Sequence, residues 1–567
     1  MSCTTLLVGK KASYDGSTMI ARNDDSQSGK YMPKKLTVVA PQEQPRHYRS
    51  VISHVEIDLP DDPMRYSAIP NVPKVEGIWA GAGVNAANVA MTATETIASN
   101  ERVLGADPLV VLQPAENGRP EQPGGIGEED LVTIVLPYIR SAREGVLRTA
   151  RLLEKYGTYE MNGMAFADVN EIWWMETLGG HHWIAKRVPD DQYVVMPNES
   201  GIDSFDLADA LGAGVDHLCS ADLKEFMERN HLDLTMLAPE GDTAFAGRTQ
   251  EGRTQAGRTQ AGSAGSAQTG AAEGGSSVAA GTIFNPRHAF GTQSDADHVY
   301  NTPRAWFMLR YFNPRSAKWD GPDAQFTPRS NDLPWSMRPE RKITVEDFKY
   351  ILSSHFQGTP YDPYNVCGDT SMRGAYRCIG VNRTDFLALL QLRPNVPKEI
   401  RAVEWLTFGS NVFNSFIPFY PNTDKVPEYL AYTEEKVDTD SFYWSCRLLA
   451  ALADAQFMTC KFLVERYQIK VMAEAHRILN EADRKVREIV DSYEDYYGDM
   501  DYYDGLEEEY SEDVKIDTET AAQVQTIIDD ANEALADMLK EETTDVLGKV
   551  LKETSNHMKN AYARSDA

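Results

Sequence analysis

Short runs of β-forming residues recur through the first 240 residues of the chain. The first two runs, residues 4–8 and 17–22, flank the turn dipeptide Asp15-Gly16, and this pattern predicts an antiparallel hairpin. Four further runs are separated by turn residues such as Gly179-Gly180. They predict a meander of antiparallel strands at residues 164–167, 171–176, 182–187 and 192–196.

Helical spacing of apolar residues marks three other segments. Residues 131–156 form the first, and Gly157 follows them as a C-cap. Residues 442–480 and 518–551 carry the same periodicity, so the region 441–567 is predicted to be mostly helical, with a helical hairpin. The two arms are joined through residues 491–513, where 11 of 23 residues are acidic and none is basic. This composition predicts a solvated acidic loop.

One segment of low complexity interrupts the remaining part of the chain, which is predicted to be a single large domain over residues 3–440. Residues 246–281 repeat Gly-Arg-Thr-Gln three times and continue in glycine, serine and alanine. Such a segment has too few large apolar side chains to form a core. We therefore expect a flexible insertion there.

The charge of the chain limits its partners. With 85 acidic and 56 basic residues among 567, the formal net charge is −29, which disfavours nucleic acid and anionic membrane surfaces. We find neither a stretch of about 18 apolar residues nor the features of a signal peptide, so a cytoplasmic location is expected. The six cysteines are scattered, which indicates neither a disulfide framework nor a structural zinc site.

Cys3 is the candidate nucleophile because it lies so close to the start of the chain. Removal of Met1 and Ser2 as a short leader would leave the α-amine of Cys3 free, and such an amine can act as the base for its own thiol. Pairing of Gly9 with Gly16 in the first hairpin would place Cys3 opposite Arg22. A guanidinium there would favour the thiolate by its charge.

Two carboxylates follow this arginine, Asp24 and Asp25, and either could hold the α-amine of Cys3. A strand-end salt bridge is the simpler interpretation of the same residues. The pair His181-His182 with Glu176 could suggest a metal, but adjacent residues of a strand point to opposite faces. No metal and no cofactor are predicted.

Several motifs together resemble the dipeptidase A family, cysteine peptidases of the Ntn-hydrolase superfamily that are related to secernins and to penicillin V and bile salt acylases. The likeness begins with residues 3–25, Cys-Thr-Thr-Leu-Leu-Val-Gly to Arg-Asn-Asp-Asp, and covers about residues 3–480. Further matching stretches are Gly83-Val84-Asn85, residues 90–96, Ala142-Arg143-Glu144-Gly145, residues 179–183, residues 187–191 and residues 358–364.

The resemblance implies a fold and a set of site residues. The fold is α+β, a four-layer αββα sandwich of two antiparallel sheets, here with a C-terminal helical extension. Cys3 is the implied nucleophile and, through its α-amine, the base. The implied tuning residues are Arg22 and Asp25, where the three-residue spacing from Arg22 favours Asp25 over Asp24.

Three further residues are implied with roles around the reacting carbonyl. Asn198 resembles an oxyanion-hole asparagine, Asn85 a second polar contact to that carbonyl, and Arg304 a further active-site arginine. The alternative for both asparagines is a turn residue that bonds its own backbone.

The predicted function is hydrolysis of dipeptides through a thioester on Cys3, by a protein expected to act on small peptides and to form a homo-oligomer. The first alternative is an acylase that hydrolyses a non-peptide amide on the same fold. The second is a catalytically silent, secernin-like interaction protein, against which the presence of Cys3, Arg22 and Asp25 argues. The side-chain preference, the number of subunits and the way in which Ser2 is removed do not follow from the sequence.

Overall fold

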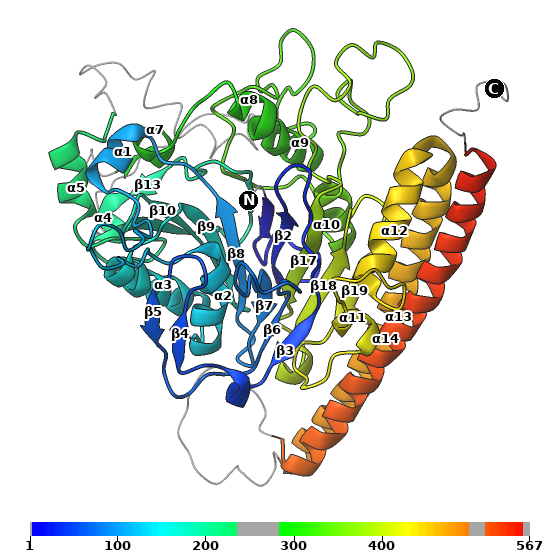
Figure 1. Cartoon of the computed structure of the whole chain (residues 1–567). Coiled ribbons are helices and arrows are strands. Elements are labelled where there is room, and N and C mark those ends of the chain that lie inside the picture. Colours follow the sequence, from blue (N-terminus) through cyan, green and yellow to red (C-terminus); the bar gives the residue numbers. More distant parts are fainter. Residues whose placement is uncertain (1–2, 235–282, 498–515, 559–567) are drawn as a thin grey trace, which may run out of the picture.

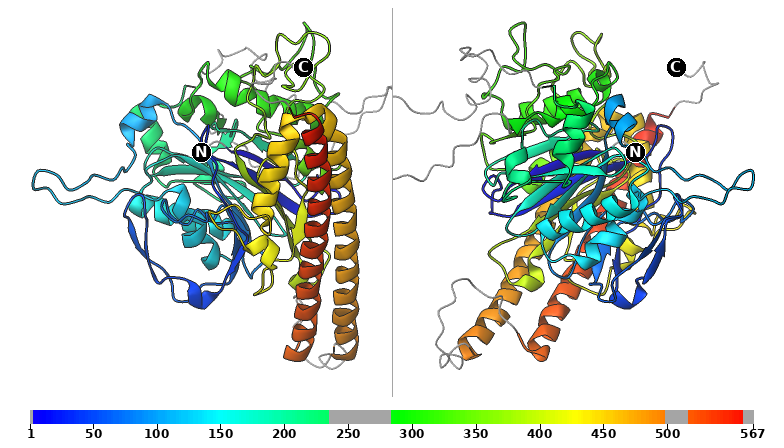
Figure 2. Two further views of the ribbon diagram at one scale, coloured as in Figure 1. Left: turned by 45° about the vertical axis from the view of Figure 1, so that its right-hand side comes forward. Right: turned by 90° about the vertical axis from the view of Figure 1, so that its left-hand side faces the viewer.

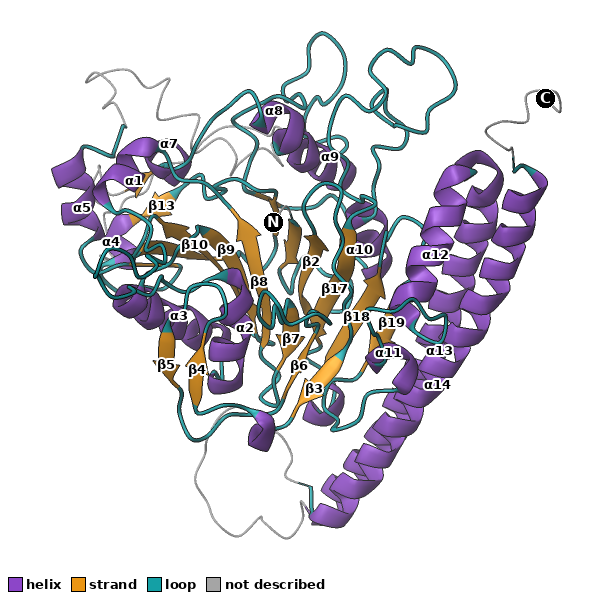
Figure 3. Ribbon diagram, in the orientation of Figure 1, coloured by secondary structure: helices purple, strands orange, loops and turns teal. Residues whose placement is uncertain are grey.

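Two antiparallel β-sheets form the centre of the molecule, with helices around them (Figure 1, Figure 3). The computed structural model describes residues 3–234, 283–497 and 516–558. The seven-stranded sheet has the order β16 (Ser336–Met337), β12 (Tyr193–Met196), β1 (Thr4–Val8), β2 (Thr18–Asp25), β17 (Thr384–Leu392), β18 (Ala402–Phe408) and β19 (Ile417–Phe419). The six-stranded sheet has the order β14 (His217–Cys219), β11 (His182–Arg187), β10 (Ile172–Leu178), β9 (Asn162–Ala167), β8 (Ala90–Thr96) and β7 (Ala82–Val84). The predicted α+β class with antiparallel sheets is confirmed.

The central strands are covered on both faces. The sheets face each other, with β2 against β8 and β9 and with β7 against β17 and β18. Helix α2 (Glu128–Val135) lies against β8, and α3 (Ala142–Tyr156) lies against β9, β10 and β11. On the seven-stranded sheet, α10 (Val345–Leu352) lies against β1, β2 and β17, and α9 (Thr302–Phe312) against β12. Every residue of β1, β2, β17 and β18 is therefore buried, and polar residues on them face other protein groups instead of water.

The first hairpin forms with a different register from the predicted one. Arg22 pairs with Thr5, and the last pair is Val8 with Met19, so the loop is wider than a Gly9–Gly16 pairing allows. The reason is that the loop backbone bonds elsewhere: the Gly9 N–H donates to the Gln192 carbonyl, and the Lys11 N–H donates to the Asp190 carbonyl. The predicted pairing of Cys3 with Arg22 is wrong by two residues, which keeps both side chains on one face of the sheet.

Two other predictions need correction. The segments predicted as a meander all contain strands, but only β9, β10 and β11 pair in succession, whereas β12 leaves them and pairs with β1. The helix predicted over residues 131–156 is two helices, because Pro137 lies in a 3-10 turn (Leu136–Tyr138) between α2 and α3. The predicted C-cap Gly157 is confirmed, with φ of 69°.

Three C-terminal helices pack together along the β18–β19 edge of the molecule. They are α12 (Phe442–Ala455), α13 (Phe457–Tyr497) and α14 (Thr518–Asn556). Helices α13 and α14 run side by side and extend well beyond the sheets (Figure 2). The predicted leader 1–2, the insertion 246–281 and the acidic residues 498–513 lie outside the described residues, while residues 491–497 belong to α13.

Smaller elements complete the described chain. The paired short strands are β3 (Thr37–Val39) with β6 (Tyr66–Ala68), β4 (His47–Arg49) with β5 (Glu56–Asp58), and β13 (Phe205–Asp206) with β15 (Ile283–Phe284). The short helices are α1 (Glu101–Ala106), α4 (Leu207–Ala210), α5 (Leu223–Asn230), α7 (Pro286–Phe290), α8 (Asp297–Tyr300) and α11 (Glu428–Ala431), and two more 3-10 turns cover Pro41–Glu43 and Lys398–Ile400.

Candidate active site

The sulfur of Cys3 lies against a buried guanidinium. Cys3 directly precedes β1 and is fully buried. Arg22, in the middle of β2, donates a hydrogen bond from Nη2 to Cys3 Sγ at 2.9 Å. A cation held at this distance stabilises a thiolate relative to a thiol. Two of the predicted site residues therefore meet, as the shared face of the hairpin requires.

Asp24 shares that face with them. Its Oδ1 accepts a hydrogen bond from Arg22 Nη2 at 2.9 Å and lies 3.8 Å from Cys3 Sγ. Its Oδ2 lies 2.7 Å from Lys34 Nζ. Burial raises the pKa of Asp24, but the charges of Lys34 and Arg22 outweigh burial, so this pKa lies below its ordinary value. Asp24 is therefore a carboxylate beside the sulfur.

Asp25 points to the other side of the strand. Arg377 Nη2 donates to its Oδ2, and Thr384 Oγ1 donates to its Oδ1 at 2.6 Å. Asp25 is fully buried, and the alternation of side chains along β2 separates it from the face of Arg22. Asp24, not Asp25, thus contacts the sulfur and the arginine.

Arg304 and Asn198 lie on the main-chain side of Cys3. Arg304, near the start of α9, donates from Nη1 to the Cys3 carbonyl and to Thr4 Oγ1, the latter at 2.7 Å. Its Nη2 donates to Asn198 Oδ1 at 2.8 Å. The Asn198 amide nitrogen donates to the Thr96 carbonyl at 3.0 Å. The structure therefore brings both residues next to the backbone of Cys3.

Asn85 lies in the turn between β7 and β8. Its Nδ2 donates to the carbonyls of Leu136 and Ile139 at 2.8 and 2.7 Å. Its Oδ1 accepts from the backbone N–H groups of Ala87 and Val89 at 3.0 and 3.1 Å. These four bonds fit the alternative of a turn asparagine.

Glu128 completes the site, and sequence reasoning missed it. It is the first residue of α2, only 3% exposed, and its Oε1 accepts a hydrogen bond from Arg22 Nη2. Lys34 was missed as well. The signal for Glu128 was the run Glu128-Glu129-Asp130 after Gly127, since three consecutive acidic residues leading into an apolar helix are costly to bury without a partner or a function.

More carboxyl groups lie behind Glu128. Burial, together with the charge of Asp130, raises the pKa of Glu129 to about 7, and burial raises the pKa of Asp130 to about 6. Burial and the charge of Glu128 raise the pKa of Glu160 to about 7, and Glu160 Oε1 accepts the Glu128 backbone N–H at 2.7 Å. These groups hold protons near neutral pH more readily than ordinary carboxylates do.

One set of possible metal ligands lies in this site. Cys3 Sγ and one carboxylate oxygen each of Asp24 and Glu128 lie within 4.8 Å of one another. Arg22 Nη2 contacts all three residues, so a bound cation would have to displace the guanidinium. The histidines considered in the sequence contact one carboxylate instead: His181 Nδ1 and His182 Nδ1 lie 2.9 and 2.8 Å from Asp107. They do not point to opposite faces, because His181 precedes β11.

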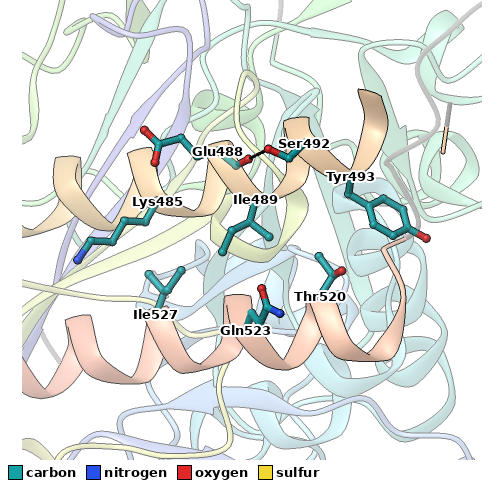
Figure 4. A pocket seen from close by; sticks show the side chains of 8 residues that line it. All are labelled: Lys485, Glu488, Ile489, Ser492, Tyr493, Thr520, Gln523 and Ile527. Atoms are coloured by element: carbon teal, nitrogen blue, oxygen red, sulfur yellow. Dashed lines mark hydrogen bonds between the residues drawn. The ribbon is translucent and has the colours of Figure 1, made fainter. Parts of the chain in front are cut away.

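One hollow of the described surface lies elsewhere. It is a groove of about 550 Å³ between α13 and α14 (Figure 4), lined by Lys485, Glu488, Ile489, Ser492, Tyr493, Thr520, Gln523 and Ile527. This part of the helical hairpin lies beyond the sheets, away from β1 and β2 (Figure 1). It is lined by no cysteine and by none of the predicted site residues, so this groove is distinct from the site around Cys3.

A cysteine sulfur held by a buried arginine is typical of a reactive cysteine, the kind of residue that serves as a nucleophile in enzymes with covalent intermediates. The chain belongs to peptidase family C69, whose sequence profile matches residues 2–470. It is 51% identical over 574 residues to a protein of Bifidobacterium longum (strain NCC 2705) named dipeptidase, with all of both chains covered. The predicted family resemblance is confirmed.

Two other relatives carry similar names. A probable dipeptidase A of Streptococcus pyogenes serotype M3 (strain SSI-1) is 46% identical over 568 residues, covering 100% of both chains. Dipeptidase A of Lactobacillus helveticus is 41% identical over 490 residues, or 86% of this chain and 89% of that protein. Among the described residues, no helix is both long and apolar enough to cross a membrane.

Proposed function

We propose that the chain is a cysteine-type dipeptidase that hydrolyses dipeptides through a thioester on Cys3. The observation that carries this proposal is the 2.9 Å hydrogen bond from Arg22 Nη2 to Cys3 Sγ, in a chain that belongs to a peptidase family and has relatives named dipeptidase. The two facing sheets with α2 and α3 on one and α9 and α10 on the other support the αββα sandwich of Ntn-hydrolases.

The proposed reaction begins after Met1 and Ser2 are removed. The free α-amine of Cys3 takes the thiol proton, and the sulfur attacks the scissile carbonyl. Asn198 holds the oxyanion in this reaction; its link to Arg304, which also bonds the Cys3 carbonyl, supports this role. The α-ammonium then protonates the leaving amine, and water hydrolyses the thioester. Arg22 stabilises the sulfur as its charge develops. A homo-oligomer and a cytoplasmic location remain part of the proposal.

A substrate panel tests the proposed reaction. The purified chain is expected to hydrolyse dipeptides with kcat/KM at least about a hundredfold above that for N-acyl amides of the acylase type, a discrimination within the range of polar recognition. Measurement of released amino acid for both sets decides between them. Faster cleavage of the amides would favour the acylase alternative, and no hydrolysis of either set would favour the silent interaction protein.

Asp24→Asn and Asp25→Asn test which carboxylate serves the α-amine. We expect Asp24→Asn to lower kcat by about a hundredfold, as for a group that orients a catalytic base, because Asp24 contacts the sulfur. Asp25→Asn is expected to lower kcat less than tenfold. Both values are measured on protein whose folding is verified by circular dichroism. A larger loss in Asp25→Asn would restore the assignment based on sequence spacing.

Alkylation and chelation test the nature of the nucleophile. Iodoacetamide is expected to inactivate the mature enzyme as Cys3 is alkylated, because Arg22 favours its thiolate; other cysteines, such as the exposed Cys367, can react without loss of activity. EDTA is expected to leave activity unchanged, since Arg22 occupies the centre of the one candidate ligand set found in the described chain. Activity lost to EDTA and restored by zinc would contradict the cysteine mechanism.

A further inference from the structure

One carboxylate oxygen of the site has no partner. Glu128 Oε1 is held by Arg22, but Oε2 is buried and accepts no hydrogen bond from the described residues. An unsatisfied carboxylate oxygen in a buried site costs free energy, so such an atom points to a ligand that supplies the missing donor. Asp24 differs from Glu128 in this respect, because Arg22 and Lys34 engage both of its oxygens.

Glu128 is placed within reach of a substrate on Cys3. One of its carboxylate oxygens lies within 4.8 Å of Cys3 Sγ. A carbonyl carbon poised for attack lies about 3–3.5 Å from the sulfur. The nitrogen on the preceding carbon lies about 2.5 Å from that carbonyl carbon, given standard N–Cα and Cα–C bond lengths. A charge-assisted hydrogen bond of about 2.8 Å from this nitrogen to Glu128 fits these distances.

We propose that Glu128 Oε2 binds the free α-ammonium group of the first substrate residue, so that the site selects peptides with an unblocked N-terminus. This assignment rests on the proposed dipeptidase function. Glu128 is here a binding residue that touches the substrate. Arg22 holds Oε1, so the carboxylate is fixed in one orientation before the substrate binds. Oε2 is then available to accept a hydrogen bond from the ligand.

The negative charge offered to a substrate ammonium group is that of Glu128 itself. Glu129 accepts hydrogen bonds from Ser50 and Tyr159 and, like Asp130 and Glu160, holds a proton near neutral pH more readily than an ordinary carboxylate. Lys34 pairs with Asp24, and Arg22 engages only Oε1 of Glu128, so Oε2 is left for a second cation. A neutral acyl group in place of the ammonium would leave Oε2 without a donor, which is the basis for rejecting N-blocked substrates.

The test compares two substrates that differ only in the amino group, Ala-Ala and propionyl-alanine. For the mature wild-type enzyme, kcat/KM is expected to be at least about a hundredfold higher for Ala-Ala. Glu128→Gln is expected to reduce this ratio to below about fivefold, chiefly through a higher KM for Ala-Ala. Glu128→Asp keeps the charge and should retain a ratio above about tenfold. Glu129→Gln, an identical change at the next residue, should leave the ratio as in wild type.

The ratio separates binding of the substrate from other roles of Glu128. If Glu128 only oriented Arg22 or held the α-amine of Cys3, Glu128→Gln would slow both substrates equally and leave the ratio unchanged, which would overturn the assignment. A wild-type ratio near one would overturn it too, whether or not the variants fold. Wild-type protein that cleaves amides but no dipeptide would contradict the proposed function itself, a result distinct from an unchanged ratio.

Discussion

A chain held at Ser2 is expected to hydrolyse dipeptides at least about a thousandfold more slowly than a chain that begins at Cys3. The nitrogen of Cys3 is an amide in the longer chain and cannot accept a proton at neutral pH, so the thiol loses its base. Cys3 is also fully buried in the chain that still carries Met1 and Ser2. The measurement is turnover of a dipeptide by two preparations whose N-termini are verified by intact mass.

Two variants of the nucleophile serve as controls for this comparison. Cys3→Ala is expected to abolish turnover. Cys3→Ser should retain a trace, because a hydroxyl can use the same α-amine but is a poorer nucleophile. Equal rates for the chains that begin at Ser2 and at Cys3 would contradict the N-terminal-nucleophile mechanism. Cys3 would then be an ordinary cysteine nucleophile with its base elsewhere.

Arg22→Ala is expected to lower kcat by at least about a hundredfold and to slow alkylation of Cys3 at pH 7. Arg22 Nη2 contacts the sulfur, Asp24 and Glu128, so its loss removes the cation beside the nucleophile. It also leaves Glu128 buried without a cation, since Asp24 keeps Lys34, and this is expected to cost about 3–5 kcal/mol of stability. Turnover, the iodoacetamide rate and urea unfolding are measured on the same preparation.

A second arginine, which is partly buried, distinguishes loss of catalysis from loss of stability. Arg393 pairs with Asp483 and follows directly after the far end of β17. Arg393→Ala should lower the free energy of unfolding as well, because it leaves Asp483 without its cation, but kcat should stay within about threefold of wild type. An Arg22→Ala protein that is destabilised and yet turns over like Arg393→Ala would contradict the proposed role of Arg22.

The order of the residues along β2 decides which of the two aspartates lies beside Arg22. The three-residue spacing from Arg22, as in related hydrolases, favours Asp25 for the α-amine, whereas side chains two residues apart share a face of a strand. In the structure Asp24 contacts Arg22 at 2.9 Å and Asp25 contacts Arg377 and Thr384. The predicted register of the hairpin differs from the observed one by two residues. Because the side-chain period of a strand is two, Cys3 and Arg22 still lie on the same face.

The acidic run at residues 128–130 marks Glu128 as unusual, but no local pattern shows that Glu128 or Lys34 lies beside Arg22 and Asp24. Glu128 is separated from Arg22 by 106 positions, and no periodicity connects the first turn of α2 with β2. Glu128 and Arg22 are in contact because α2 lies against β8 and β8 lies against β2. Only the packing of the two sheets and their helices decides such a meeting, since the charges attract over a few ångströms once the layers have formed.

The sequence by itself determined features that depend on neighbouring residues, namely the strand and helix segments and the hairpin that carries Cys3 and Arg22. Its motifs also determined the family. The tertiary structure decided the register of that hairpin, the departure of β12 to pair with β1, and the choice of Asp24 beside the sulfur. It also placed Asn85 in a turn, where its side chain bonds backbone groups, and placed Glu128 beside Cys3. Propensity and spacing act over a few residues, whereas these contacts join strands and helices far apart in the chain, where burial on both faces selects the partners.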